Sequence, residues 1–287
     1  MHVWGKLLEL LDAEMTRPTM FGWFHLLFFA ASIVAGILLC VRFKEGTYRQ
    51  ARGVILTVAV LVTVLELYKQ INYSLTYTGE AIIFDYQWYA FPWQFCSMPM
   101  YVGLLAGLTK PGKVHDSLCA FLATYAVFAG LCVMLYPVDV FTRTIGINIQ
   151  TMICHGSMLT VGIYLLCTGY VKIRHETILK AIPVFGVALL VAVIMNEIAY
   201  GAGLLETDEF NMFFVSPHCE PSLPVYSSVQ RAVAYPWCLF VYIAVFTFAA
   251  YVVLLLAMLV QKAAHGFSHK KRITMAIQTE TKEPVLH

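Results

Sequence analysis

Residues 20–41 read MFGWFHLLFFAASIVAGILLCV and contain no Lys, Arg, Asp or Glu. A helix needs about 20 consecutive, mainly apolar residues to cross a bilayer, so this stretch predicts a membrane span. Six further segments have the same character, the second of them borderline. The seven predicted spans are 20–41, 52–73, 90–109, 115–136, 150–171, 179–200 and 235–260. The predicted fold class is all-α: a polytopic membrane helix bundle with seven transmembrane helices.

The overall composition agrees with this prediction. Of the 287 residues, 60% are hydrophobic and 13% are charged, whereas soluble domains carry roughly 25% charged residues. A formal charge of +2 with no basic tract argues against nucleic acid as a partner. The eight cysteines form no C-x-x-C pair and indicate neither a disulfide framework nor a metal site. Nothing else in the sequence points to a cofactor.

The distribution of Lys and Arg predicts the orientation, because basic residues accumulate on the cytoplasmic side of membrane proteins. Basic residues follow the first, third, fifth and seventh spans. The N-terminus is therefore expected outside and the C-terminus inside. Three regions are predicted: an N-terminal interfacial helix (1–19), a transmembrane domain (20–262) with an outer loop (201–234), and a polar cytoplasmic tail (263–287). The few basic loop residues on the other side are Lys6, Arg17, Arg143 and Arg231.

Polar and ionisable side chains inside the spans are candidates for function, because such groups are rare and costly in a membrane. With the predicted orientation, nearly all of them fall near the outer ends of five spans, in one polar layer. The members of this predicted layer are His25, Glu66, Lys69, Asn72, Cys96, His155, Asn196 and Glu197. Asn211, in the outer loop, is a polar residue that could reach the layer.

Cys96 and His155 are the candidate catalytic pair. Cys96 lies in the first turns of its span, where free backbone N–H groups and the helix dipole favour a thiolate. Pro99 cannot donate a backbone hydrogen bond, which opens the helix locally. His155 lies at the matching level of the fifth span and would act as the general base, with Glu66 or Glu197 orienting its ring. The structural interpretation is a small buried thiol in a layer of interhelical hydrogen bonds.

The sequence also resembles the YwaF-like family of integral membrane proteins, which includes an animal ether-phospholipid acyltransferase. The similar stretches are FGWFHLLFF (21–29), LELYKQIN (65–72), FCSMPMY (95–101), CHGSMLTVGIYLL (154–166), NMFFVSPHCEPSL (211–223) and YPWCLFVY (235–242). In the animal acyltransferase, a cysteine and a histidine early in two spans are implicated in acyl transfer. The resemblance implies that role for Cys96 and His155. Bacterial relatives typically have a histidine where this chain has Gln94.

Two functions follow from these observations. The first is a thiol-dependent lipid acyltransferase, with membrane lipids (phospholipid or lysophospholipid) as partners. The second is a membrane carrier or sensor that binds a small solute or a proton at Glu66, Lys69 and Glu197, with no covalent chemistry. A purely structural polar layer is a third interpretation. The expected location is the cell membrane, or an endomembrane in a eukaryotic host.

Overall fold

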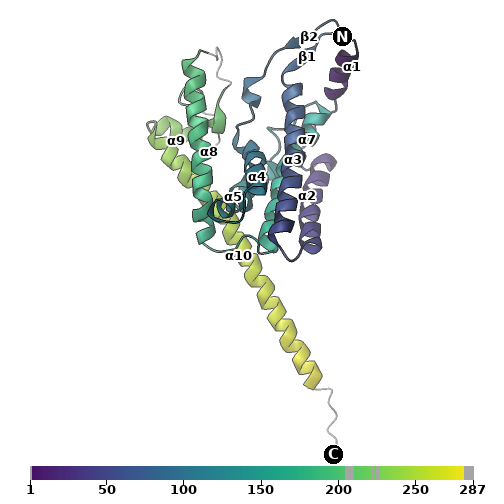
Figure 1. The fold of residues 1–287 in the computed structure, drawn as a ribbon, viewed down its shortest axis with the longest axis vertical. Helices are drawn as coiled ribbons and strands as arrows, with labels where there is room; N and C mark the ends of the chain where they lie inside the picture. Colours follow the sequence, from purple (N-terminus) through teal and green to yellow (C-terminus); the bar gives the residue numbers. More distant parts are fainter. Residues whose placement is uncertain (1, 204–209, 221–222, 224–225, 281–287) are drawn as a thin grey trace, which may run out of the picture.

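The computed structural model is a bundle of helices with a small β-hairpin at one end (Figure 1). It describes residues 2–203, 210–220, 223 and 226–280, and only the backbone of residue 2 and of residues 265–280. Parts of the predicted outer loop (204–209, 221–222 and 224–225) and of the predicted tail (281–287) lie outside the described residues. The predicted interfacial segment contains a short helix, α1 (His2–Leu11).

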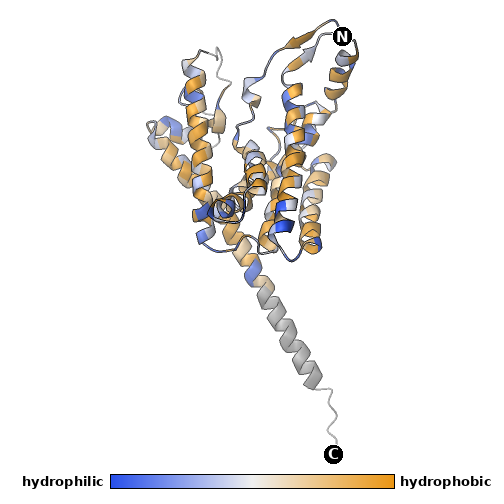
Figure 2. Ribbon diagram, in the orientation of Figure 1, coloured by the Kyte–Doolittle hydropathy of each residue, from blue (hydrophilic) through white to orange (hydrophobic). Residues whose placement is uncertain are grey.

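Within the described part of the chain, six helical segments are long and apolar enough to cross a membrane. Each agrees with a predicted span to within a few residues. Figure 2 shows that hydrophobic residues predominate along these helices. The segments are α2 (Trp23–Arg42), α3 (Tyr48–Asn72), α5 (Lys113–Ala123) with α6 (Tyr125–Leu135), α7 (Ile145–Cys167), α8 (Glu176–Gly201), and the first part of α10 (Trp237–Glu280).

The predicted span 90–109 is a shorter helix than expected. Its helical part is Phe95–Leu108, formed by a 3-10 turn, η2 (Phe95–Ser97), and α4 (Met98–Leu108). Helix is disfavoured for the residue before a proline, and Pro92 and Pro99 bracket the start of this segment. The preceding chain is instead a hairpin of β1 (Leu75–Tyr77) and β2 (Ile82–Phe84), a 3-10 turn η1 (Trp88–Ala90), and an extended stretch.

The helices α3, α4, α6 and α7 pack closely around the middle of the molecule, and α5 packs against α8. Small residues permit the closest approaches. A Cβ atom added at Gly130 of α6 would lie 2.7 Å from the carbonyl oxygen of His155 on α7. This contact fixes α6 and α7 at a short separation.

The bundle has two ends that are distinguished below. The hairpin end carries β1 and β2, and α9 (Tyr226–Ala232) lies beside α8 (Figure 1). The 3-10 turn η3 (Met212–Phe214) packs against α8. The tail end carries the connections 43–47, 109–112 and 168–175. From the tail end the backbone of α10 projects away from the bundle as a continuous helix to Glu280.

Candidate functional site

Cys96 lies at the junction between an extended segment and a short helix, deep in the bundle. The indole Nε1 of Trp93 donates to the carbonyl oxygen of Ala188, near the middle of α8, at 3.2 Å. The hydroxyl of Tyr101 donates to the Pro92 carbonyl at 2.8 Å. Non-helical backbone at membrane depth is tolerated where protein surrounds it. The extended half of this segment therefore reaches the interior and delivers Cys96 there.

Gln94 holds this extended segment to the chain around η3. Its side-chain Nε2 donates to the Asn211 carbonyl, and its Oε1 accepts from the Phe213 backbone N–H, both at 3.0 Å. Asn196 of α8 makes a similar reciprocal pair with the backbone of Met212, at 2.8 and 3.0 Å. The η3 segment thus forms a polar, hydrogen-bonded link between α8 and the turn that carries Cys96.

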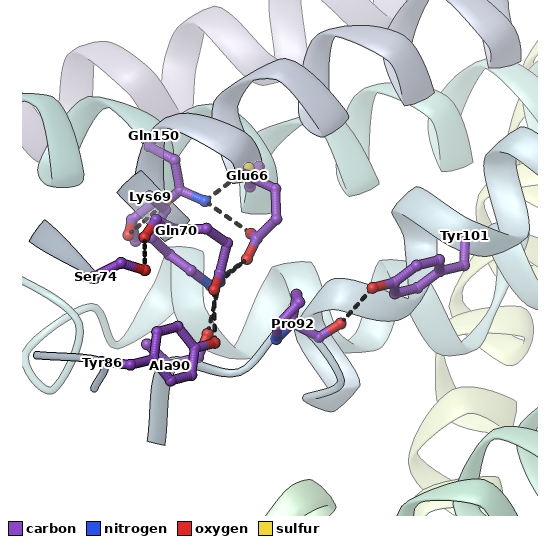
Figure 3. Close-up of polar contacts among 11 residues, drawn as sticks. Glu66, Lys69, Gln70, Ser74, Tyr86, Ala90, Pro92, Tyr101 and Gln150 are labelled. Carbon is purple, nitrogen blue, oxygen red and sulfur yellow. Dashed lines mark hydrogen bonds and ion pairs between the residues drawn. The ribbon is translucent and has the colours of Figure 1, made fainter. Parts of the chain in front are cut away.

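A buried ion pair lies near the hairpin end of α3 (Figure 3). The Lys69 ammonium is 2.7 Å from Glu66 Oε1, and the side chains are 17% and 9% exposed. Gln70 Nε2 donates to the same carboxylate oxygen at 2.8 Å. From α7, Gln150 Nε2 approaches Glu66 Oε2 at 3.4 Å and Cys154 Sγ at 3.4 Å. Two side-chain amides therefore donate to the Glu66 carboxylate. Such hydrogen bonds offset part of the desolvation cost of burying an ion pair.

The connection between the hairpin and η1 covers this ion pair. Gln70 Nε2 donates to the Ala90 carbonyl at 2.9 Å, and the Tyr86 hydroxyl donates to Gln70 Oε1 at 2.7 Å. Burial, followed by the nearby charge of Glu66, raises the pKa of Tyr86 to about 12. Because a phenol with this pKa stays protonated at neutral pH, Tyr86 remains a donor and holds the cover closed.

Cys96 is close to this network. Its thiol lies within electrostatic range of Lys69 and Glu66. The side chain is half-buried and packs against the main hydrophobic core. The neighbouring Phe95 ring inserts among the rings of the core, including Phe185 at 5.6 Å between centroids. Tight packing of Phe95 therefore fixes the position of the thiol beside it.

His155 is a buried base with one unused nitrogen. Its Nδ1 is 2.8 Å from the Thr151 carbonyl, so Nδ1 must carry the proton and donate it. Nε2 then holds a lone pair, and in the described part of the structure this atom has no hydrogen-bond partner. Cys96 and His155 are consequently not hydrogen-bonded to each other here. Lys69 lies within electrostatic range of both residues.

Comparison with known proteins adds one result to this geometry. The model of the TMEM164 family matches residues 20–258 of the chain, which include the first six predicted spans and all but the last two residues of the seventh. The chain belongs to the TMEM164 family. The curated proteins and the solved structures yield no significant match. This TMEM164-family protein is therefore a multi-pass membrane protein, and its six apolar helices agree with that assignment.

Three other residues of the predicted polar layer lie away from the Glu66–Lys69 pair in this TMEM164-family protein. Each has a different partner. His25 Nε2 contacts the Met134 carbonyl at 2.8 Å. Asn72 donates to Asp12 at 3.3 Å, near α1. Glu197 pairs with His218 at 3.1 Å and is 47% exposed. The structure thus groups Glu66 and Lys69 near Cys96 but does not bring His25, Asn72 or Glu197 into the same group. Asn196 is connected to the turn that carries Cys96 only through η3 and Gln94.

Sequence reasoning missed four members of this group: Gln70, Tyr86, Gln150 and Cys154. Cys154 accepts a hydrogen bond from Gln150. Two of these contacts could have been predicted from helical spacing, because residues four positions apart face each other on a helix. Gln70 is four residues after Glu66, and Gln150 is four residues before Cys154. The contact of Gln150 with Glu66 joins residues 84 positions apart, and no local pattern reveals it.

Proposed function

We propose that this TMEM164-family protein is a thiol-dependent lipid acyltransferase, with Cys96 as the nucleophile and His155 as the general base. The observation that carries the proposal is the unpartnered Nε2 of His155. A buried polar atom without a hydrogen bond costs about 1–3 kcal/mol, and a folded protein keeps such an atom where it serves a purpose. A buried imidazole with a free lone pair is ready to accept a proton.

The reaction proceeds in two half-reactions. The Cys96 thiol gives its proton to His155 Nε2, and the sulfur attacks an ester carbonyl carbon of a donor phospholipid. The ester C–O bond breaks, and the departing lysophospholipid alkoxide takes the proton from the imidazolium. A hydroxyl group of an acceptor lipid then attacks the thioester with His155 again as base, which transfers the acyl chain and restores the thiol.

Access for an acyl chain requires a change in the bundle. An apolar crevice begins at Pro99 and runs between α3, α4 and α7, where Val62 and Met158 are among its lining residues. Its volume is about 20 Å³, whereas ligand sites typically enclose about 300–1,000 Å³. In this proposal α3 and α4 separate when the lipid enters, which also lets Cys96 approach His155.

We further propose that the predicted span 90–109 is a seventh crossing, in which a short extended stretch leads into the helical part, Phe95–Leu108. This arrangement leaves the N-terminus outside and the C-terminus inside, as the distribution of basic residues predicts. The reactive thiol then lies within the membrane, where the ester groups of lipids entering from the outer leaflet can reach it through the hairpin end.

The test is to trap the acyl-enzyme. Purified protein in vesicles is incubated with phosphatidylcholine that carries a labelled acyl chain, and hydroxylamine-sensitive label on Cys96 is located by mass spectrometry. We expect label on the wild type, none on Cys96→Ala, and at least tenfold less on His155→Gln. The control variant is Cys132→Ser, which removes an exposed thiol on α6. Lipid acyl exchange that continues in Cys96→Ala would contradict the proposal.

A carrier or sensor is the second candidate, favoured by the buried Glu66–Lys69 pair. In that function the pair binds a small solute or a proton, and the Tyr86 cover opens to admit it. Replacing both catalytic candidates, as in Cys96→Ser with His155→Ala, would then leave transport intact, whereas Glu66→Gln would abolish it. Solute or proton flux into vesicles measures the difference.

A further inference from the structure

A second polar site lies at the tail end, away from Cys96 and His155. It is a cavity of about 370 Å³ between the start of α5, the connection after α7 and the first turns of α8. Its lining includes His115, Cys119 and Tyr170 on the inside, with Lys172, Arg174 and Lys180 among the residues around them. None of its lining residues takes part in the acyl transfer proposed for Cys96 and His155.

His115 is held in one tautomer. The side chain is 2% exposed, and its Nδ1 is 3.0 Å from the carbonyl oxygen of Ala106 on α4. A carbonyl only accepts, so Nδ1 carries the proton and Nε2 has the lone pair. The ring of Tyr48 packs edge-on against the imidazole at 5.4 Å between centroids. The imidazole is therefore fixed with its basic nitrogen toward the cavity residues.

Two donors share that basic nitrogen. The Tyr170 hydroxyl is 2.5 Å from Nε2, and the Cys119 sulfur, one helical turn from His115, is 3.4 Å from it. Burial, followed by the nearby Cys119, raises the pKa of Tyr170, so the phenol stays protonated and donates. A thiol next to an oriented imidazole is the arrangement of a Cys/His nucleophile pair, with the Ala106 carbonyl as the group that orients the base.

The cavity has an excess of positive charge. Lys180 pairs with Asp116 at 3.1 Å, and Arg174 approaches Glu176 at 3.9 Å. Among the residues that the structure describes, no ion pair or hydrogen bond engages the ammonium group of Lys172. This unpaired cation lines the same cavity as the Cys119 thiol and suits a ligand that carries phosphate groups.

We propose that Cys119 is a second acylation site, which receives an acyl chain from a thioester whose thiol carrier bears phosphate groups. Cys119 gives its proton to His115 Nε2, and the sulfur attacks the thioester carbonyl. A new C–S bond forms to Cys119, the bond to the carrier sulfur breaks, and the carrier thiolate takes the proton from His115. Tyr170 holds the imidazole in place, and Lys172 binds the phosphate-bearing carrier.

The experiment uses the full chain with Cys96→Ala, so that its outcome is independent of the proposed lipid acyl transfer. The protein in vesicles is incubated with palmitoyl-coenzyme A, or with the phosphate-free palmitoyl thioester of N-acetylcysteamine. Peptide mass spectrometry then locates hydroxylamine-sensitive acyl groups. We expect Cys119 to be acylated by both reagents, and faster by palmitoyl-coenzyme A.

Three variants separate the roles. His115→Gln, which retains a polar side chain of similar size, should lower the acylation of Cys119 at least tenfold with both reagents. Lys172→Gln should lower it several-fold with palmitoyl-coenzyme A only, and Cys132→Ser should have no effect. Thermal unfolding verifies that each variant is folded. An unmodified Cys119, or acylation of Cys119 that is equal with and without His115, would overturn the proposal.

Discussion

The three most deeply buried histidines differ in the use of their ring nitrogens. His25 accepts from the Phe21 backbone N–H at Nδ1 and bonds the Met134 carbonyl through Nε2. His115 is also bonded at both nitrogens. His155 alone of the three has an unpartnered nitrogen in the described structure. The presence of a histidine in a span therefore does not identify a catalytic base. The hydrogen-bond partners of its two ring nitrogens show which protons it can accept.

The ion pair between Glu66 and Lys69 gives a prediction about stability. Glu66→Gln leaves the Lys69 cation buried without its partner, so it should lower the free energy of unfolding by about 3–5 kcal/mol. Adding Lys69→Met should recover a large part of that loss, because no uncompensated charge then remains. Thermal unfolding of the purified protein in detergent measures both effects.

The matched control is the exposed pair of Lys180 and Asp116, whose side chains are 53% and 51% exposed. Breaking that pair with Asp116→Asn should change stability by no more than about 1 kcal/mol. Equal effects at the two pairs would show that the Glu66 pair is open to water, contrary to the network described above.

At the scale of the elements, the contact of α6 with α7 depends on Gly130. Gly130→Ala places a Cβ atom 2.7 Å from the His155 carbonyl and 2.9 Å from the Met158 Cβ. The two helices must move apart, at a cost of about 1–3 kcal/mol. The melting temperature should therefore fall, and any activity that depends on His155 should fall with it.

Gly186 of α8 provides the comparison, because a Cβ atom added there meets nothing within 4 Å. Gly186→Ala should leave the melting temperature unchanged or raise it, since alanine is the better helix former by about 1 kcal/mol. A loss of stability in Gly186→Ala as large as in Gly130→Ala would contradict the close contact between α6 and α7.

The sequence predicts the helices better than it predicts the site. Long apolar runs are local signals, and six of the predicted spans agree with helices of sufficient length. The segment at 90–109 differs, because its helical part is only Phe95–Leu108 and Pro92 disfavours a helical conformation at Phe91. Glu66 and Lys69 were recognisable from their spacing of three residues. The contacts of Gln94 with Asn211 and Phe213 depend on how distant segments pack, which spacing does not reveal.

At the scale of the whole molecule, the orientation in the membrane can be tested by thiol labelling. Glu80→Cys lies in the hairpin and Lys110→Cys in a turn at the tail end, and both positions are exposed. With Cys132 and Cys167 replaced by Ser, a membrane-impermeant maleimide should label Glu80→Cys in intact cells. Lys110→Cys should react only after permeabilisation. The reverse pattern would invert the predicted orientation.

The hydrogen bond from Trp93 to Ala188 also has a consequence for biogenesis. The segment that carries Cys96 is too short to be a membrane anchor by itself, and the indole N–H of Trp93 in its extended half needs an acceptor inside the protein. That acceptor is the Ala188 carbonyl of α8, which the ribosome makes much later. The segment can therefore settle into its final place only when the second half of the chain has been synthesised, so a truncated product would lack a formed thiol site.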